Sequence, residues 1–169
     1  IDSRIAGNGT LEAALRLDFR LEEAYEGLAL VAHASGDAEA AIAAFSRGIE
    51  ADPGYVPHWL GRAQALNVQG QIRLNRGEDP TEAFQAAEAD LGRVAGLQNG
   101  LAEAWMWRGN VRTNLALWQI SRGSDPSEPT EGAIADFGKA LSLEPGLVAA
   151  WVSRGKARMN RGMWAVRRG

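Results

Sequence analysis

Cysteine is absent from this sequence of 169 residues. Thiol catalysis, disulfide bonds and cysteine zinc sites are therefore excluded, and the redox compartment is left open. Histidine is also scarce: His33 and His58 are the only two, and neither stands in a His-x-x-x-His or Glu-x-x-x-His pair that would place two ligands on one helical face. Glycine-rich phosphate-binding motifs are missing as well. We therefore expect no metal site, no cofactor and no catalytic residue.

Long apolar runs and an excess of one charge sign are missing too. No apolar run approaches the roughly 18 residues that cross a bilayer. The net charge is −3, so no basic field attracts nucleic acid or anionic lipid. We expect neither a nucleic acid nor a membrane as partner. The chain starts without Met and stops inside a helical pattern, so we expect it to be part of a longer protein.

What the sequence contains is an internal repeat. Trp59, Trp105 and Trp151 follow one another at intervals of 46 residues. Chance does not align many unlike residues in one register, so the interval indicates duplication. The same interval relates Arg62, Arg108 and Arg154, and the pairs Arg76/Arg122, Gly77/Gly123, Asp79/Asp125, Pro80/Pro126, Glu82/Glu128, Ala87/Ala133, Asp90/Asp136, Gly92/Gly138, Leu97/Leu143 and Gly100/Gly146.

The preceding unit is shorter, because Tyr25 leads Trp59 by 34 residues. That unit resembles the tetratricopeptide repeat, which has an aromatic residue early in its first helix, small residues at helix contacts, an aromatic in its second helix and a final proline. The residues that carry the resemblance are Tyr25, Leu28, Ala29, Gly36, Ala41, Phe45 and Pro53, and later Trp105, Gly109, Ala133, Phe137, Ala140 and Pro145. The middle copy has Asn99 where the proline would be. The resemblance implies an all-α fold, a right-handed superhelix of antiparallel helix pairs.

The repeats divide the chain into one domain over residues 1–169. We expect a partial unit at 1–21, a 34-residue repeat at 22–55, enlarged repeats at 56–101 and 102–147, and a final partial unit at 148–169. Apolar periodicity and end signals predict helices at 11–18, 20–35, 38–51, 55–76, 80–97, 101–122, 127–143 and 147–167. The last of these is a first helix without its second.

The enlargement adds 12 residues between the two helices of a pair. Gly77 and Gly123 suit the left-handed end of a helix, and Asp79 and Asp125 suit the cap of the next one, with a proline after each. We expect both helices of an enlarged pair to gain about six residues each. Long units with this Arg-Gly-x-Asp-Pro turn are similar to repeats that follow bacterial serine/threonine kinase domains.

Arginines recur in register with acidic residues. One interpretation is an ion pair within each unit, Arg62 with Asp90 and Arg108 with Asp136, because a half-buried guanidinium needs a partner. The alternative is an arginine stripe, continued by Arg112 and Arg158, that grips an acidic or phosphorylated ligand. The additional tryptophans Trp107, Trp118 and Trp164 are expected to fill the core, or one of them to hold a peptide.

The resemblance implies that the first helix of each pair lines the concave face. Amides there suit hydrogen bonds to an extended peptide, and apolar residues suit its side chains. The family's carboxylate-gripping variant needs paired Lys, Arg and Asn, and is not supported by a single lysine. The expected peptide-binding residues are Leu60, Gln64, Asn67, Met106, Asn110, Asn114, Val152, Lys156 and Asn160.

These patterns predict a non-catalytic scaffold for protein–protein or peptide interaction, with a protein or peptide partner that the sequence does not identify. One alternative is a structural module that stacks end to end, giving weak homo-oligomers through incomplete solenoid ends. Another is a docking or sensor region of a larger signalling protein such as a kinase.

Overall fold

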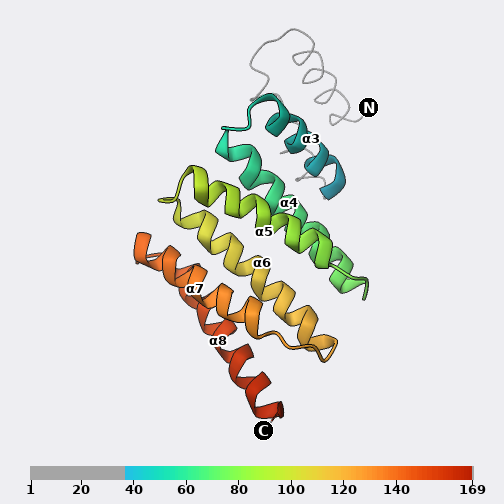
Figure 1. Cartoon of the computed structure of the whole chain (residues 1–169), viewed down its shortest axis with the longest axis vertical. Coiled ribbons are helices and arrows are strands. Elements are labelled where there is room, and N and C mark those ends of the chain that lie inside the picture. The colour runs from blue at the N-terminus through green and yellow to red at the C-terminus, as the bar shows by residue number, and fades with distance from the viewer. Residues whose placement is uncertain (1–36, 169) are drawn as a thin grey trace, which may run out of the picture.

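The computed structural model describes residues 37–168, and within that range the chain forms six helices and no strand. The predicted all-α helical repeat fold is confirmed, and the predicted helices at 11–18 and 20–35 lie outside the described residues, as do Tyr25, His33 and Gly36. The bounds of the others agree with prediction to within one residue (Figure 1): α3 Ala38–Ala51, α4 Val56–Asn75, α5 Thr81–Leu97, α6 Ala102–Ser121, α7 Ser127–Leu143 and α8 Val148–Arg168.

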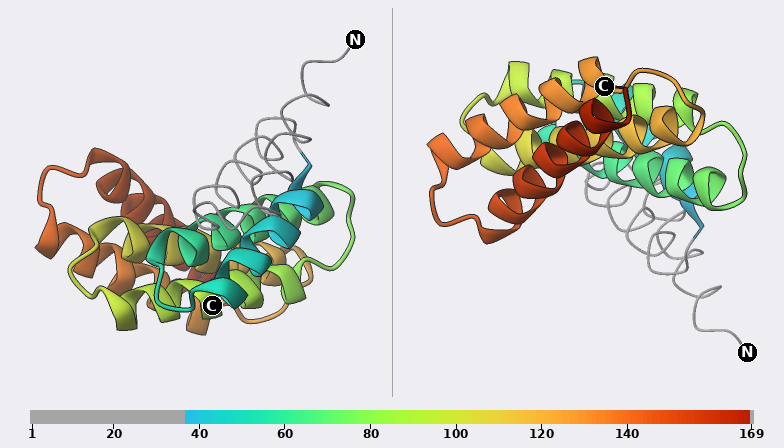
Figure 2. Two further views of the ribbon diagram at one scale, coloured as in Figure 1. Left: turned by 90° about the horizontal axis from the view of Figure 1, so that it is seen from above. Right: turned by 90° about the horizontal axis from the view of Figure 1, so that it is seen from below.

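The helices form two layers along the stack. One layer contains the first helices of the pairs, α4, α6 and α8, and the other contains the second helices, α3, α5 and α7. Each helix packs on the next one along the chain, and the first helices of successive pairs also touch, α4 with α6 and α6 with α8. Within the described range α3, α5 and α7 do not contact one another. The first helices therefore lie closer to one another than the second helices do, and this difference makes the stack curve. The side formed by α4, α6 and α8 is the concave one. Figure 2 shows the stack from both ends.

The core forms successive clusters along the stack, and α6 contributes residues to two of them. One cluster joins α4, α5 and α6 through residues such as Leu66, Phe84, Leu91 and Leu115. The next joins α7 to α8 through Phe137, Leu141, Ala150 and Ala157, with Trp105 of α6 packed against it. A single pair could not bury its apolar face alone, which is why neighbouring pairs must stack.

The turns inside the enlarged pairs follow the sequence signals. Gly77 and Gly123 have φ of +75° and +70°, the left-handed conformation expected after α4 and α6. The carboxylate of Asp79 accepts a hydrogen bond from the Thr81 backbone N–H at 2.9 Å, and Asp125 accepts from Ser127 at 3.0 Å. The predicted N-cap positions are wrong by one residue, because Pro80 and Pro126 themselves occupy the N-cap positions of α5 and α7. Each aspartate stands one residue earlier and bonds the backbone N–H of the first helical residue.

The enlargement is shared unequally between its parts. The helices α5 and α7 have 17 residues each, against 14 in α3, so the second helices gain three residues and not about six. Five residues, 76–80, form the turn between α4 and α5. The expected gain in the second helix was too large because much of the added sequence lies before Thr81.

The repeated tryptophans make the same hydrogen bond and the same arginine contact, although Trp151 is 52% exposed and the other two are half-buried. Each indole Nε1 donates to a backbone carbonyl six residues earlier: Trp59 to Pro53 at 2.9 Å, Trp105 to Asn99 at 3.0 Å and Trp151 to Pro145 at 3.0 Å. The arginine three residues later lies over each ring, 4.3–5.1 Å from its centre. Asn99 replaces the proline without changing this contact, because only the backbone oxygen takes part.

Candidate functional site

A groove of about 290 Å³ crosses the concave side and is lined by three successive first helices. Because α4, α6 and α8 each contribute, the groove depends on the stacking of pairs and not on any one helix. Most of its lining residues carry an amide or a hydroxyl group, and Trp107 and Leu117 add apolar surface. Its lining residues are Asn67 and Gln71 of α4, Trp107, Asn110, Thr113, Asn114 and Leu117 of α6, and Ser153 and Lys156 of α8.

Four of the residues predicted to bind peptide lie together in this groove: Asn67, Asn110, Asn114 and Lys156. The Asn114 side-chain amide donates to the Asn67 Oδ1 at 3.0 Å and so links α6 to α4. That bond uses one amide hydrogen of Asn114, whereas no side-chain bond is recorded for Asn110 among the described residues. Asn110 and Lys156 are therefore the two predicted residues best placed to meet a ligand.

The other predicted residues lie elsewhere along the concave side. Leu60 and Gln64 line a separate, mainly apolar hollow of about 380 Å³ near the starts of α4 and α6, together with Phe45 and Leu101. Met106 is half-buried against the core cluster of α7 and α8.

Asn160 and Val152 differ sharply in exposure although both belong to α8. The side chain of Asn160 is 7% exposed and lines a small hollow of about 70 Å³ with Ile120, Met163 and Trp164. Val152 is 53% exposed. The role of both in binding stays a prediction.

Several groove residues were not predicted, and a plain signal could have found them. Gln71 follows Asn67 by one helical turn, and Leu117 follows Thr113 in the same way, so each lies on the same face as its predecessor. These residues were missed because the prediction followed the ordinary 34-residue repeat, whereas the longer first helices extend the concave face by one more turn.

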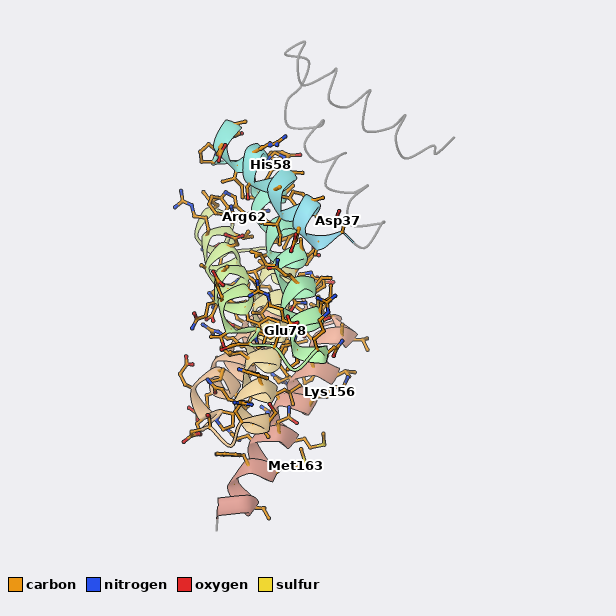
Figure 3. All side chains as sticks on the ribbon, turned by 90° about the vertical axis from the view of Figure 1, so that its right-hand side faces the viewer. Asp37, His58, Arg62, Glu78, Lys156 and Met163 are labelled. Atoms are coloured by element: carbon orange, nitrogen blue, oxygen red, sulfur yellow. The ribbon has the colours of Figure 1, made fainter. Side chains whose placement is uncertain are left out.

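Figure 3 shows Lys156 of the groove on α8, together with Met163 on the same helix.

Trp107 forms an aromatic wall of the groove. Its ring is half-buried against the core around Phe84 and Leu91, and its Nε1 donates to Glu103 at 3.1 Å. Trp118 packs against the same cluster without lining the groove. Both tryptophans therefore fill space between helices as expected, and Trp107 also offers part of its face to the groove.

The predicted ion pairs are confirmed. Arg62 donates from Nε and Nη2 to the two oxygens of Asp90, both at 2.7 Å, and Arg108 holds Asp136 in the same two-pronged way. Arg112 adds a third contact, from Nη1 to Asp136 at 2.9 Å, and also pairs with Glu88. Asp90 and Asp136 are buried, so these arginines join the two helices of a pair.

The hydrogen bonds to aspartate raise the pKa of both arginines, Arg62 and Arg108. The hydrogen bond to Asp90 raises the pKa of Arg62 above its ordinary value, and burial opposes that effect. The hydrogen bond to Asp136 raises the pKa of Arg108 in the same way. Both guanidiniums thus stay charged, and their charge is satisfied inside the protein.

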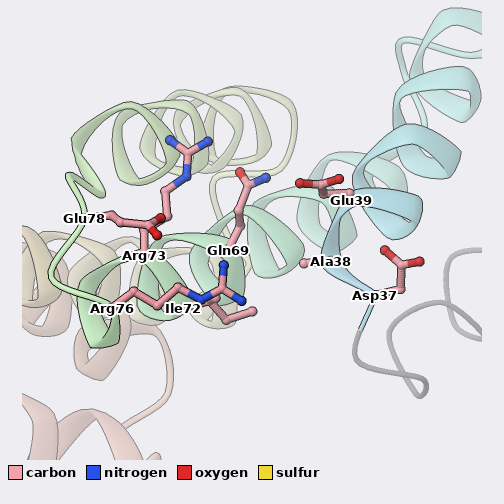
Figure 4. A pocket seen from close by; sticks show the side chains of 8 residues that line it. All are labelled: Asp37, Ala38, Glu39, Gln69, Ile72, Arg73, Arg76 and Glu78. Atoms are coloured by element: carbon pink, nitrogen blue, oxygen red, sulfur yellow. The ribbon is translucent and has the colours of Figure 1, made fainter.

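A larger hollow of about 520 Å³ lies between the start of α3 and the end of α4. In Figure 4, Gln69, Arg73 and Arg76 come from α4, and Asp37 and Glu39 from the start of α3. Its charged groups carry both signs and offset one another, which distinguishes it from the amide-lined groove.

No group of three or more His, Asp or Glu side chains in residues 37–168 could hold a metal ion. His58 is fully buried, and its ring lies so close to Gly48 that a Cβ there would come within 2.5 Å. Its place is between α3 and α4, in contact with the Tyr55 ring at 4.7 Å. None of the helices in that range is both long and apolar enough to span a bilayer.

Comparison with known proteins supports the resemblance. The sequence pattern of the tetratricopeptide repeat matches residues 22–55, the unit of 34 residues. No curated protein sequence matches this one closely enough to count as a relative.

Solved structures share the fold over most of the chain. The first repeat domain of Spaghetti (RPAP3), bound to the HSP90 peptide SRMEEVD, is 22% identical with a TM-score of 0.66, over 86% of this chain and 96% of that one. The second such domain of human RPAP3, in complex with the HSP70 peptide SGPTIEEVD, is 24% identical with a TM-score of 0.63, over 79% and 92%. MamA is 20% identical with a TM-score of 0.66, over 94% and 78%. At these identities the likeness shows the fold.

Proposed function

We propose that this chain, which has the tetratricopeptide-repeat fold, is a non-catalytic scaffold that binds an extended segment of another protein in its concave groove. The observation that carries the proposal is the convergence of amides from two successive first helices, and of Lys156 from a third, on one groove of about 290 Å³. Two of the structurally similar domains hold short peptides.

The chemistry of the groove favours a polar, extended segment. Asn110 and Gln71 each carry an amide that can donate and accept, which matches the alternating N–H and C=O groups of an extended backbone. Trp107 adds a flat apolar surface for a side chain, and Lys156 adds one positive charge. A single lysine favours one acidic group in the ligand and not a paired carboxylate clamp.

The test is selection of 12-residue peptides from a random library against the purified chain. A triple variant, Gln71→Ala with Asn110→Ala and Lys156→Ala, removes one group from each of the three helices. We expect the selected peptides to lose about tenfold or more in affinity, because these groups are the polar contacts of the groove. Within residues 37–168 the side chains of these three residues form no hydrogen bond or ion pair, so folding should be retained.

The matched control removes an exposed amide and hydroxyl from the opposite layer, Gln85→Ala on α5 with Ser142→Ala on α7. We expect this control to bind as the unaltered chain does. Selected peptides that bind the triple variant and the control equally well would refute the groove as the binding site.

A further inference from the structure

Two further hollows adjoin the groove on the concave side, one toward each end of α6. The hollow of about 380 Å³ at the starts of α4 and α6 is lined mainly by apolar side chains, Leu60 and Leu101 among them. It meets the groove where the Trp107 Nε1 donates to Glu103 at 3.1 Å, because Trp107 lines the groove and Glu103 lines this hollow. The hollow of about 70 Å³ between α6 and α8 shares Leu117 with the groove. The three hollows therefore form one track along α6.

The first hollow is bordered by a glycine where the next repeat has a tryptophan. Gly61 lines this hollow, and the residue 46 positions later is Trp107. Phe45 of α3 packs against Gly61 so closely that a Cβ there would overlap the Phe45 ring. Packing between α3 and α4 therefore fixes this wall, and the hollow is preformed with room for one large apolar side chain.

Asn160 supplies a buried amide at the other end of the track. Its side chain is 7% exposed and borders the smallest hollow together with Leu117 and Ile120. Within residues 37–168 this amide takes part in no hydrogen bond, whereas its equivalent in the preceding repeat, Asn114, donates to Asn67 at 3.0 Å. Buried polar groups are normally hydrogen-bonded, so the Asn160 amide is available to the backbone of a ligand.

The length of α6 sets the spacing of the three contacts. Along this helix the first hollow lies beside residues 101–103, the groove beside 110–114 and the last hollow beside 117–120. A helix advances about 1.5 Å per residue and an extended peptide about 3.3 Å. The first interval, about 15 Å, therefore corresponds to about four or five ligand residues, and the second, about 10 Å, to about three.

We propose that the track recognises an extended segment with three defined side chains. A large apolar residue occupies the hollow at Leu101, an acidic residue about four or five positions away meets Lys156, and a small apolar residue about three positions further lies beside Asn160. Among the described residues that line the three hollows, Lys156 is the only cation, so only the middle contact is acidic. This inference rests on the proposed function, since it requires that a peptide binds in the groove.

The peptides selected from the 12-residue library test the pattern directly. We expect their alignment to show the three residue types at this spacing, in one chain direction. Replacing the large apolar residue or the acidic residue of a selected peptide by alanine should weaken binding about tenfold or more, as measured by fluorescence anisotropy. Replacing the small residue by tryptophan should do the same, because the last hollow has only about 70 Å³. Selected peptides that bind in the groove but lack the pattern would overturn this inference.

Leu101→Asp places a charge in the first hollow. Leu101 is the N-cap residue of α6, a position that favours aspartate, so α6 should still form. We expect the selected peptides to bind this variant about tenfold more weakly or worse, because an apolar side chain would then bury a carboxylate. The matched control is Leu147→Asp, the same change directly before α8 and outside the three hollows, and it should bind as the unaltered chain does. Equal binding to Leu101→Asp and to the control would refute the apolar contact.

New selections against the variants check each contact separately. Against Leu101→Asp, we expect Lys or Arg in place of the large apolar residue, with the acidic residue kept. Against Lys156→Glu, we expect a basic residue in place of the acidic one, with the large apolar residue kept at the same spacing. Selections that return the original pattern against both variants would overturn the assignment.

The triple variant of the groove separates the two proposals. Selected peptides that bind the triple variant as well as the unaltered chain would refute the groove, and this inference with it. Peptides that lose affinity for the triple variant but bind Leu101→Asp undiminished would refute only the three-residue pattern and leave the groove as the binding site.

Discussion

Glycine and phenylalanine form complementary pairs between the two helices of an enlarged unit. The backbone at Gly109 approaches Phe137 so closely that no Cβ fits, and Gly70 approaches Phe84 in the same way. The sequence predicts small residues at helix contacts, Gly109 and Ala133 among them, and an aromatic residue, Phe137, in the second helix. Their exact partners required coordinates, because an apolar periodicity shows which face is buried but not which side chain fills which gap.

Gly109 and Gly155 stand at equivalent positions 46 residues apart and should respond oppositely to alanine. We expect Gly109→Ala to lower the free energy of unfolding by about 1–3 kcal/mol, because its Cβ would overlap the fully buried Phe137 ring. Gly155→Ala should raise the free energy by about 0.5–1 kcal/mol, because alanine favours the helix and the added atom meets nothing. Urea unfolding measures both, and equal effects of the two changes would contradict the packing described.

The buried aspartates of the two enlarged pairs are both paired with arginine, but they differ in the number of arginines that bind them. Asp90 accepts hydrogen bonds from one arginine, whereas Asp136 accepts from Arg108 and Arg112. The 46-residue spacing predicted both ion pairs correctly. It did not predict the double contact, because the equivalent of Arg112 in the earlier unit is Leu66.

Loss of the carboxylate should therefore cost more at Asp136 than at Asp90. We expect Asp136→Asn to destabilise by about 3–5 kcal/mol, since it removes the carboxylate that pairs with Arg108 and one of the two carboxylates that pair with Arg112. Asp90→Asn leaves only Arg62 unpaired and should cost less. Thermal unfolding of the two variants side by side gives the comparison, and a larger loss for Asp90→Asn would argue against the shared contact at Asp136.

At the scale of whole helices, turn chemistry decides where α5 and α7 begin. The Gly-x-Asp-Pro motif predicts both helix starts to within one residue, because each signal acts locally: glycine adopts positive φ, and the aspartate bonds the backbone N–H of the first residue of the next helix. The length gained by each helix was predicted less well. Twelve added residues can be divided between two helices and a turn in several ways, and packing against neighbouring pairs selects among them.

The hydrogen bond that Asp79 accepts from Thr81 at the start of α5 should make the stability depend on pH in the acid range. Its hydrogen bonds with Thr81 lower the pKa of the Asp79 carboxyl below its ordinary value. A folded-state pKa below the unfolded one means that the stabilisation is present above about pH 4 and is lost as the pH falls through the folded value. We expect Asp79→Asn to flatten this part of the profile of melting temperature against pH.

The neighbouring exposed acid provides the control for this effect. Glu78→Gln removes a carboxyl that accepts no recorded hydrogen bond at the start of α5, so its profile should follow that of the unaltered chain. If both substitutions flatten the profile equally, general charge and not the hydrogen bond between Asp79 and Thr81 is responsible.

For the molecule as a whole, stability should follow the one-dimensional order of the stack. Each pair contacts its neighbours alone, and the core passes from one cluster to the next through shared helices. The repeat interval predicted this arrangement, and the resemblance to the tetratricopeptide repeat implied that Asn110 and Lys156 belong to first helices that line one side of it. The groove itself emerged only when three helices were assembled, because its walls come from residues up to 89 positions apart, Asn67 and Lys156 among them.

Removal of α8 should consequently weaken the chain locally. Deleting residues 148–169 takes Ala150 and Ala157 out of the cluster that contains Phe137 and Leu141, so apolar surface of α7 becomes exposed. We expect the amides of α7 to exchange hydrogen about tenfold faster or more, while those of α4 and α5 keep most of their protection. Hydrogen exchange resolved by peptide, with the undeleted chain as reference, measures this gradient. Uniform loss of protection from α3 to α7 would instead mean that the pairs fold as a single cooperative unit, and the additive description of the stack would then be wrong.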